Sequence, residues 1–282
     1  MPRLSAAKRV VNKFLFPLGL EVRRVAPSAE SSTATYSYGN EDAIIEELLG
    51  KVTWRNKFAV DIGAGDGEFM SNSYRLFKEG WTGIAFEWDG RQFAKLAFLY
   101  SPLSNVSLVR GRVTPDNVLH LLAACDAPKE FGYLGLDIDS YDHFVLEKLL
   151  SAYRPSVICT EINEKIPPPV RFAANWDVNG SWGKDHFYGQ SLSMLEALGK
   201  RERYDLVRLE YNNAFLVAQE LNSLPVLTAA DAFRQGYVER SDRRERFPWN
   251  AEMEPVLSMP EADLKPYFEQ KFKSRAGHFV LE

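Results

Sequence analysis

Short apolar runs alternate with amphipathic segments through the middle of the chain. Runs of five or six mostly apolar residues indicate buried strands, and apolar residues spaced every three or four positions indicate helices. We expect strands at residues 58–62, 82–87, 106–110, 133–138 and 156–161, and helices at residues 68–78, 91–100, 116–124 and 143–150 between them. Strands that alternate with helices in this way predict a mostly parallel, doubly wound sheet.

Further elements flank this alternation on both sides. Asn40 can cap a helix that Gly50 ends, and a helix at 191–200 follows a proline-rich loop. The strands expected at 205–210 and 214–217 lie three residues apart, which predicts an antiparallel hairpin. The expected fold class is α/β, a Rossmann-like, doubly wound, mostly parallel seven-stranded sheet with an antiparallel edge hairpin. We divide the chain into a basic arm and linker (1–38), a main domain (39–220) and a helical C-terminal extension (221–282).

Charge and composition narrow the class of protein. The chain has 282 residues, of which 45% are hydrophobic, and its net charge is −4. Residues 1–24 hold six basic side chains and one acid, so the acidic remainder argues against nucleic-acid binding. No apolar run approaches the length of a membrane span and we find no secretory signal, so we expect a cytoplasmic protein.

The basic segment 4–24 is amphipathic and is interrupted by Pro17. It would suit weak contact with the inner face of a membrane or with a partner. An arm packed on the main domain is the other interpretation. Cys125 and Cys159 both lie in apolar surroundings, where buried, reduced thiols are expected.

A glycine loop follows the first expected strand. It reads Asp61-Ile-Gly-Ala-Gly-Asp-Gly67, and Gly63 and Gly65 allow a tight turn with close approach of a ligand. Glu87 ends the next strand, where a carboxylate can accept both hydroxyls of a ribose. A dinucleotide fingerprint would need a third glycine at position 68, which is a glutamate.

The acidic character of this loop favours a cationic ligand. Asp61, Asp66 and Glu68 would repel a pyrophosphate, whereas S-adenosylmethionine has no phosphate and carries a sulfonium and an ammonium group. We therefore predict S-adenosylmethionine as cofactor, bound by Asp61, Gly63, Gly65, Asp66, Glu87 and Asp137. A dinucleotide is the alternative ligand.

These residues resemble class I S-adenosylmethionine-dependent methyltransferases. Beyond the loop, Gly80-Trp-Thr-Gly83, Leu136-Asp-Ile-Asp139, Glu161-Ile-Asn163 and Asn212-Asn-Ala-Phe-Leu216 look like a poorly characterised bacterial family. Its members often lie among genes for surface polysaccharide or other glycoconjugate synthesis. The resemblance covers roughly residues 40–218. One departure is Asp137-Ile-Asp-Ser-Tyr-Asp142, where the family usually has Asp-Ile-Asp-Gly-Asn-Asp.

Polar residues follow the fourth and fifth expected strands. Asp137, Asp139, Glu161 and Asn163 should lie together, because the carboxyl ends of neighbouring parallel strands meet at one edge. Three carboxylates and an amide oxygen suit Mg²⁺, and metal-dependent O-methyltransferases of the catechol and sugar types have similar groups there. In the other interpretation, these acids cap helices and bind the methionine ammonium without metal. Asp142 in particular could cap the helix starting at position 143.

Three residues are candidates for the general base. His143 follows the fourth-strand acids and His186 lies in the loop before the next helix, and Asp139 takes the role if neither histidine does. The loop 164–187 contains Arg171, Trp176, Trp182 and Lys184, a combination that suits a sugar or polyol. Four arginines between 240 and 246 suit either an anionic acceptor group or a solvated helix.

The sequence therefore predicts an O-methyltransferase for a sugar, a polysaccharide terminus or a related small molecule, with Mg²⁺ as an optional aid. Two alternatives stay open: an NAD-dependent oxidoreductase, and a non-catalytic protein that binds the cofactor and interacts with partners. The oligomeric state is left open.

Overall fold

The computed structural model describes residues 36–54, 56–177, 183 and 185–282. The basic segment 4–24, most of the linker, Trp182 and Lys184 lie outside these residues, so the predictions that rest on them stay predictions. Within the described ranges, no helix is both long enough and apolar enough to cross a membrane.

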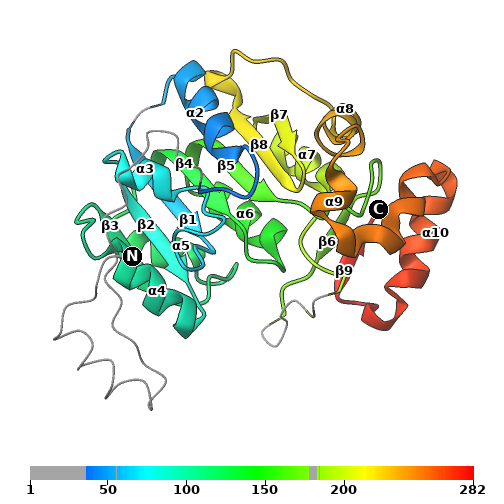
Figure 1. Cartoon of the computed structure of the whole chain (residues 1–282), viewed down its shortest axis with the longest axis horizontal. Coiled ribbons are helices and arrows are strands. Elements are labelled where there is room, and N and C mark those ends of the chain that lie inside the picture. The colour runs from blue at the N-terminus through cyan, green and yellow to red at the C-terminus, as the bar shows by residue number, and fades with distance from the viewer. Residues whose placement is uncertain (1–35, 55, 178–182, 184) are drawn as a thin grey trace, which may run out of the picture. The chain divides into compact units, whose positions relative to one another are not determined.

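A seven-stranded sheet forms the centre of the molecule, in the order β3-β2-β1-β4-β5-β8-β7 (Figure 1). Its strands are β1 (Phe58–Ile62), β2 (Thr82–Glu87), β3 (Val106–Arg110), β4 (Glu130–Leu136), β5 (Arg154–Glu161), β7 (Tyr204–Glu210) and β8 (Asn213–Ala218). Strands β1 to β5 pair in parallel, and β8 pairs antiparallel with both β5 and β7. The predicted doubly wound sheet with an antiparallel edge hairpin is confirmed.

Helices cover both faces of this sheet. They are α2 (Glu41–Lys51), α3 (Tyr74–Lys78), α4 (Gly90–Tyr100), α5 (Val118–Ala124), α6 (Asp142–Leu150) and α7 (Leu192–Arg201). Residues of α5, α6 and α7 form one apolar core and residues of α2, α3 and α4 form a second. Successive residues of a strand point to opposite faces, and accordingly Val60 belongs to the first core and Ala59 to the second. The central strands are apolar along most of their length because both of their faces are covered.

The helix expected at 68–78 begins only at Tyr74, so its predicted start was wrong. The Asp66 carboxylate accepts the N–H of Phe69 at 3.0 Å, which favours a turn over a helix. Met70 has a φ of 61°, which a right-handed helix does not permit. The Ser71 hydroxyl accepts the N–H of Tyr74 and so satisfies one free donor of the short helix.

The start and end of α2 also differ from the prediction. Asn40 precedes the helix but makes no capping hydrogen bond with its side chain. The helix runs through Gly50 to Lys51, because the N–H of Val52 still donates to the carbonyl of Leu48.

The C-terminal extension is helical, as predicted, but it ends in a strand. Its elements are α8 (Ala229–Phe233), η3 (Arg234–Val238), α9 (Arg243–Arg246), η4 (Pro248–Ser258), α10 (Glu261–Lys271), η5 (Lys273–Arg275) and β9 (Phe279–Leu281). Strand β9 pairs antiparallel with β6 (Phe172–Ala174), inside the segment 164–187 that was expected to be a loop. A third apolar core joins that segment to the extension. In it the Phe172 ring meets the edge of Phe187 and lies tilted against Phe272 and Phe279, with ring centres 5.3 to 5.8 Å apart.

We expect Phe172→Ala to lower the free energy of unfolding by about 3–5 kcal/mol, because it empties a fully buried site in this third core. Urea unfolding followed by circular dichroism measures the change. Phe98→Ala is the matched control, since Phe98 is 75% exposed and its loss should change stability by no more than about 0.5 kcal/mol. Equal stability of the two variants would show that the third core does not stabilise the fold.

Candidate functional site

A cavity of about 470 Å³ opens at the carboxyl ends of β1, β2 and β4. Six carboxylates line it: Asp61, Asp66, Glu87, Asp89, Asp137 and Asp139. Among the residues that the structure describes, no lysine, arginine or histidine lies in this lining. Amide and hydroxyl groups of Ser71, Asn72, Gln92 and Asn213 complete the polar lining. The cavity therefore has a strong preference for positive charge.

The glycine loop shapes one wall of this cavity. The N–H groups of Gly63 and Ala64 both donate to the carbonyl of Phe86, which fixes the loop to β2. A Cβ atom on Gly63 would lie 1.7 Å from the carbonyl oxygen of Asp137, so only glycine lets the ends of β1 and β4 approach this closely. Gly65 has a φ of 56°, and a Cβ atom added to it would have no atom of another part of the protein within 4 Å. This side of the loop is therefore open for a ligand.

Glu87 links the end of β2 to the glycine loop. Its carboxylate accepts the N–H of Gly65 at 2.8 Å and the N–H of Asp89 at 2.6 Å. Burial raises the pKa of Glu87, and these backbone donors partly offset that shift. The predicted contact of Glu87 with a ribose is compatible with this position at the cavity wall, since each carboxylate oxygen can accept a second hydrogen bond.

Asp61 lies at the back of the cavity and is buried. Burial raises its pKa to about 6, the negative charge of Glu87 adds to this shift, and a hydrogen bond from the Ser73 hydroxyl opposes it. Asp66, by contrast, uses its carboxylate to hold the turn at Phe69.

Asp137, Asp139 and Glu161 form a carboxylate trio. Oxygen atoms of the three side chains lie within 4.8 Å of one another. One oxygen of Glu161 accepts the amide of Asn212 at 2.9 Å, and the other is buried without a hydrogen-bond partner. Asp139 lies in the turn that follows β4. Its backbone is in the left-handed region, with a φ of 55°.

The loss of surrounding water is the largest influence on the pKa of each carboxyl of the trio. Loss of surrounding water raises the pKa of all three carboxyls, and for Asp137 and Glu161 the negative charge of the other acids raises the pKa further. The positive charge of Lys165 lowers the pKa of Asp139, but the loss of surrounding water has the larger effect, so this pKa is raised overall.

Asp142 fixes the turn after β4 that carries Asp137 and Asp139. Its carboxylate accepts the N–H groups of Ile138 and Ser140, at 2.9 and 3.0 Å. It is itself the first residue of α6, and the helix N-cap, Tyr141, makes no capping bond. The expectation that Asp142 caps a helix starting at His143 was therefore wrong.

Asn163 makes its hydrogen bonds within the loop that follows β5. Its amide nitrogen donates to the carbonyls of His186 and Tyr188, and its amide oxygen accepts the N–H of Lys165. These bonds hold the two ends of the loop together. The structure thus gives Asn163 a supporting position and leaves three carboxylates as the group that can hold a metal.

Neither candidate histidine lines the cavity. Nδ1 of His143 lies 3.0 Å from the amide oxygen of Gln190, and Nε2 of His186 lies 2.6 Å from Glu252 of the extension. Burial lowers the pKa of both imidazoles. Of the three base candidates, only Asp139 lies in the cavity lining.

A buried polar network below the loop was not predicted. The Lys165 ammonium donates to the Tyr188 hydroxyl at 2.6 Å and lies 3.3 Å from Glu164, and Tyr188 also donates to Glu164. Asn250 of the extension donates to Glu164. One feature of the sequence could have indicated this network: the adjacent charged residues Glu164 and Lys165 lie shortly after the end of a buried strand, where charged side chains are unusual.

A second cavity of about 210 Å³ adjoins the first and shares Gly63, Trp88, Ile138 and Asp139 with it. The Arg112 guanidinium lies over the rings of Trp88, Tyr141 and Trp176, at 5.3 to 5.9 Å from their centres. Gly111 and Arg112 directly follow β3, so this cavity extends from β4 toward the far side of the parallel sheet. Its flat, partly aromatic walls suit a planar group.

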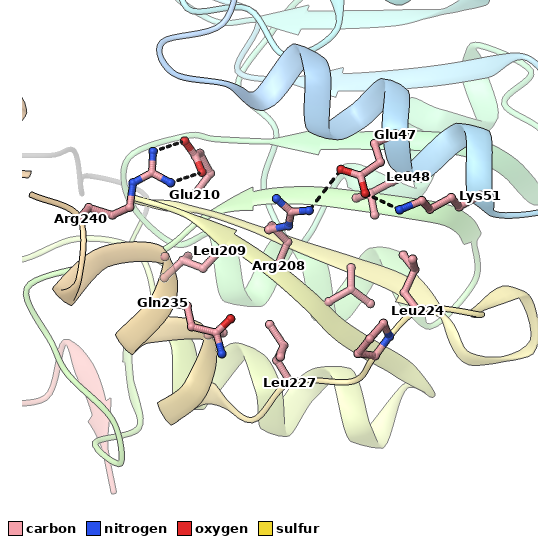
Figure 2. Close-up of a pocket in the computed structure, with 14 residues that line it drawn as sticks. Glu47, Leu48, Lys51, Arg208, Leu209, Glu210, Leu224, Leu227, Gln235 and Arg240 are labelled. Carbon is pink, nitrogen blue, oxygen red and sulfur yellow. Dashed lines mark hydrogen bonds and ion pairs between the residues drawn. The ribbon is translucent and has the colours of Figure 1, made fainter. Parts of the chain in front are cut away.

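A hollow of about 440 Å³ lies elsewhere, between α2, β7 and the segment that follows β8 (Figure 2). Arg208 lies 3.2 Å from Glu47 and Arg240 lies 3.0 Å from Glu210. Its charges are thus compensated by one another, in contrast to those of the carboxylate cavity.

Residues expected to bind the acceptor are partly used in packing. Arg171 pairs with Glu282 at the surface, and Trp176 packs on Tyr141. The arginines of 240–246 form ion pairs with acids: Arg240 with Glu210, Arg243 and Arg244 with Glu254, and Arg246 with Asp242. These pairs agree with the interpretation of a charged, solvated segment.

The chain was compared with known proteins. It matches no protein-family model, and no curated protein matches it. Among solved structures it is similar to the O-methyltransferase from Bacillus cereus in complex with SAH, with 14% identity, a TM-score of 0.42, and coverage of 77% of this chain and 91% of that one.

Two further structures have a similar fold. An S-adenosylmethionine-dependent methyltransferase from Clostridium acetobutylicum shares 11% identity at a TM-score of 0.40, and the match covers 66% of this chain and 93% of that one. Magnesium protoporphyrin IX methyltransferase from Synechocystis, with bound SAM, shares 10% identity at a TM-score of 0.41, with coverage of 77% and 98%. Because all three TM-scores are below 0.5, the function has to be inferred from the site itself.

We expect Asp61→Asn to stabilise the protein by about 2–3 kcal/mol at pH 7. The pKa of Asp61 is about 6 in the folded protein and 3.8 ordinarily, so the folded state holds the proton more tightly and stability falls as the pH rises from about 4 to about 6. Urea unfolding at pH 4 and pH 7 measures this, and the two proteins should converge at pH 4. The surface variant Asp263→Asn is the control. A variant less stable than wild type at pH 7 would contradict the raised pKa.

Proposed function

We propose that this chain is an S-adenosylmethionine-dependent methyltransferase that methylates a hydroxyl oxygen of a small acceptor such as a sugar. The observation that carries the proposal is the cavity with six carboxylates and no basic side chain. S-adenosylmethionine brings a sulfonium and an ammonium group, and it supplies the methyl group as an electrophile on sulfur. An acidic, partly desolvated cavity favours such a ligand over a neutral or anionic one.

Each part of the cofactor has a fitting region. Glu87 at the end of β2 can accept ribose hydroxyls, and the open side of Gly65 leaves room beside the backbone. The second cavity, with Trp88 and Arg112 on its walls, suits the adenine ring. Asp61 and Asp137 lie where their charge can bind the ammonium group.

An oxidoreductase that uses NAD is less well supported. The pyrophosphate of a dinucleotide would lie among the same six carboxylates, without a cation to neutralise it. Position 68 is a glutamate, and the segment 68–73 is not helical, so no helix N-terminus follows the glycine loop directly.

The carboxylate trio suits a divalent cation. Asp137, Asp139 and Glu161 would hold it, and the unpartnered oxygen of Glu161 is a buried acceptor in need of a donor or a metal. When bound, Mg²⁺ would supply Lewis-acid activation of an acceptor hydroxyl. Asp139 lines the cavity, and we assign it as the group that takes the hydroxyl proton while the oxygen attacks the methyl carbon. The carbon–sulfur bond breaks as the new carbon–oxygen bond forms.

We expect calorimetric titration to show binding of S-adenosylhomocysteine and no binding of NAD. Glu87→Gln should weaken S-adenosylhomocysteine binding about ten- to a hundredfold, because a charged acceptor of ribose hydroxyls becomes neutral. Glu79→Gln, on the surface at the end of α3, is the matched control and should bind as wild type does. Binding of NAD in preference to S-adenosylhomocysteine would overturn the proposal.

We expect Mn²⁺, as a probe for the metal site, to bind the wild-type protein and to bind Glu161→Gln at least about tenfold more weakly, since one anionic ligand is lost. The same calorimetric titration measures both proteins, with Glu79→Gln again as control. A wild-type protein that binds no Mn²⁺, and whose methyl transfer survives thorough EDTA treatment, would remove the metal from the proposal and leave the methyltransferase assignment intact.

A further inference from the structure

Exposed apolar side chains are concentrated at the carboxylate cavity. Among the residues that the structure describes, six large apolar side chains are exposed, and three of them line this one cavity: Phe69, Met70 and Trp88, with exposed fractions of 74%, 47% and 61%. Apolar groups that cluster in water beside a cavity are typical of a binding surface.

The loop holds Phe69 and Met70 in this position by specific hydrogen bonds. The Asp66 carboxylate accepts the N–H of Phe69, and the N–H of Ser71 donates to the carbonyl of Glu68 at 3.3 Å. Met70 adopts a left-handed backbone conformation, which costs free energy for any residue with a Cβ. Strain and apolar exposure at one site are a reason to look for a ligand there.

The cofactor does not account for these two side chains. Trp88 lies on the walls of both cavities and is already assigned to the nucleoside, whereas Phe69 and Met70 line only the larger cavity. That cavity also contains Asp137 and Asp139, where the acceptor hydroxyl would lie. The cofactor residues of the glycine loop also line this larger cavity, but the end of the cofactor that they would hold carries the sulfonium and ammonium groups and is not apolar. We therefore assign the two apolar side chains to the acceptor.

We propose that Phe69 and Met70 form the apolar wall of the acceptor site and that the acceptor is an uncharged hydroxylated ring, one face of which packs on them. This inference rests on the proposed function. The lack of charge follows from the cavity lining, since its six carboxylates outnumber the positive groups of the cofactor and would repel an anionic acceptor. Both a sugar ring and a phenolic ring combine an apolar face with hydroxyls at the edge.

Saturation-transfer NMR on the protein saturated with S-adenosylhomocysteine tests the proposal. The probes are the methyl glycosides of glucose, galactose and mannose and catechol, and their anionic counterparts are the methyl glycosides of glucuronate, galacturonate and mannuronate and 3,4-dihydroxybenzoate. We expect the wild-type protein to bind at least one neutral ring, and to bind its anionic counterpart at least about fivefold more weakly.

The variant Phe69→Ser with Met70→Gly removes the apolar wall. Glycine suits the positive φ at position 70, so the loop should keep its conformation. We expect this double variant to bind the neutral ring about tenfold more weakly than wild type, at unchanged affinity for S-adenosylhomocysteine. Phe98→Ser is the matched control, because Phe98 is as exposed as Phe69 but lies on α4 outside both cavities, and it should bind as wild type does.

The outcomes separate the two levels of the proposal. A wild-type protein that does not bind S-adenosylhomocysteine overturns the proposed function, and this inference with it. If that ligand binds, three results overturn the acceptor inference alone: no neutral ring binds, an anionic ring binds more tightly than its neutral counterpart, or the double variant binds rings as wild type does. Binding of glycosides only, or of catechol only, supports the inference and identifies the source of the ring.

Discussion

Clustered negative charge at the carboxyl ends of β1, β2, β4 and β5 is the constraint on which the rest of the site depends. Six carboxylates line one cavity without a basic side chain among them, and Glu161 adds a seventh acid beside it. Burial and the negative charge of neighbouring acids raise the pKa of several of these groups. A cationic cofactor, and a divalent cation in the trio, would each relieve this repulsion.

The geometry that brings the acids together depends on a few backbone positions. Gly63 allows the ends of β1 and β4 to approach because it has no Cβ, and the Asp142 carboxylate fixes the turn after β4 through two backbone donors. Left-handed conformations at Met70 and Asp139 occur in the two loops that border the cavity. Three other non-glycine residues with positive φ, Asp126, Arg203 and Tyr211, lie outside the cavity lining, so this conformation is not confined to the site.

The C-terminal extension supports the site from the other side. Strand β9 pairs with β6, and the third apolar core joins the extension to the loop that follows β5. Asn250 reaches Glu164 in the buried network, and Glu252 lies against His186. The loop that carries Lys165 and Tyr188 is therefore fixed between the main sheet and the extension. Residues far from the glycine loop in sequence thus hold the loop that follows β5 in place.

The sequence alone determined the strands and helices of the main sheet, its edge hairpin, and the glycine loop with Glu87, because each depends on local periodicity or on neighbouring residues. It also placed Asp137, Asp139 and Glu161 at the ends of adjacent strands. Only the tertiary structure decided that the segment 68–73 is a loop, since the hydrogen bonds of Asp66 and Ser71 compete with helix formation there. It also decided that Asn163 holds a loop, that His186 lies against Glu252, and that β6 pairs with β9. The loop 68–73 depends on hydrogen bonds between near neighbours that apolar periodicity does not reveal. The outcomes at Asn163, His186 and β6 depend on contacts between residues distant in sequence, which no local pattern encodes.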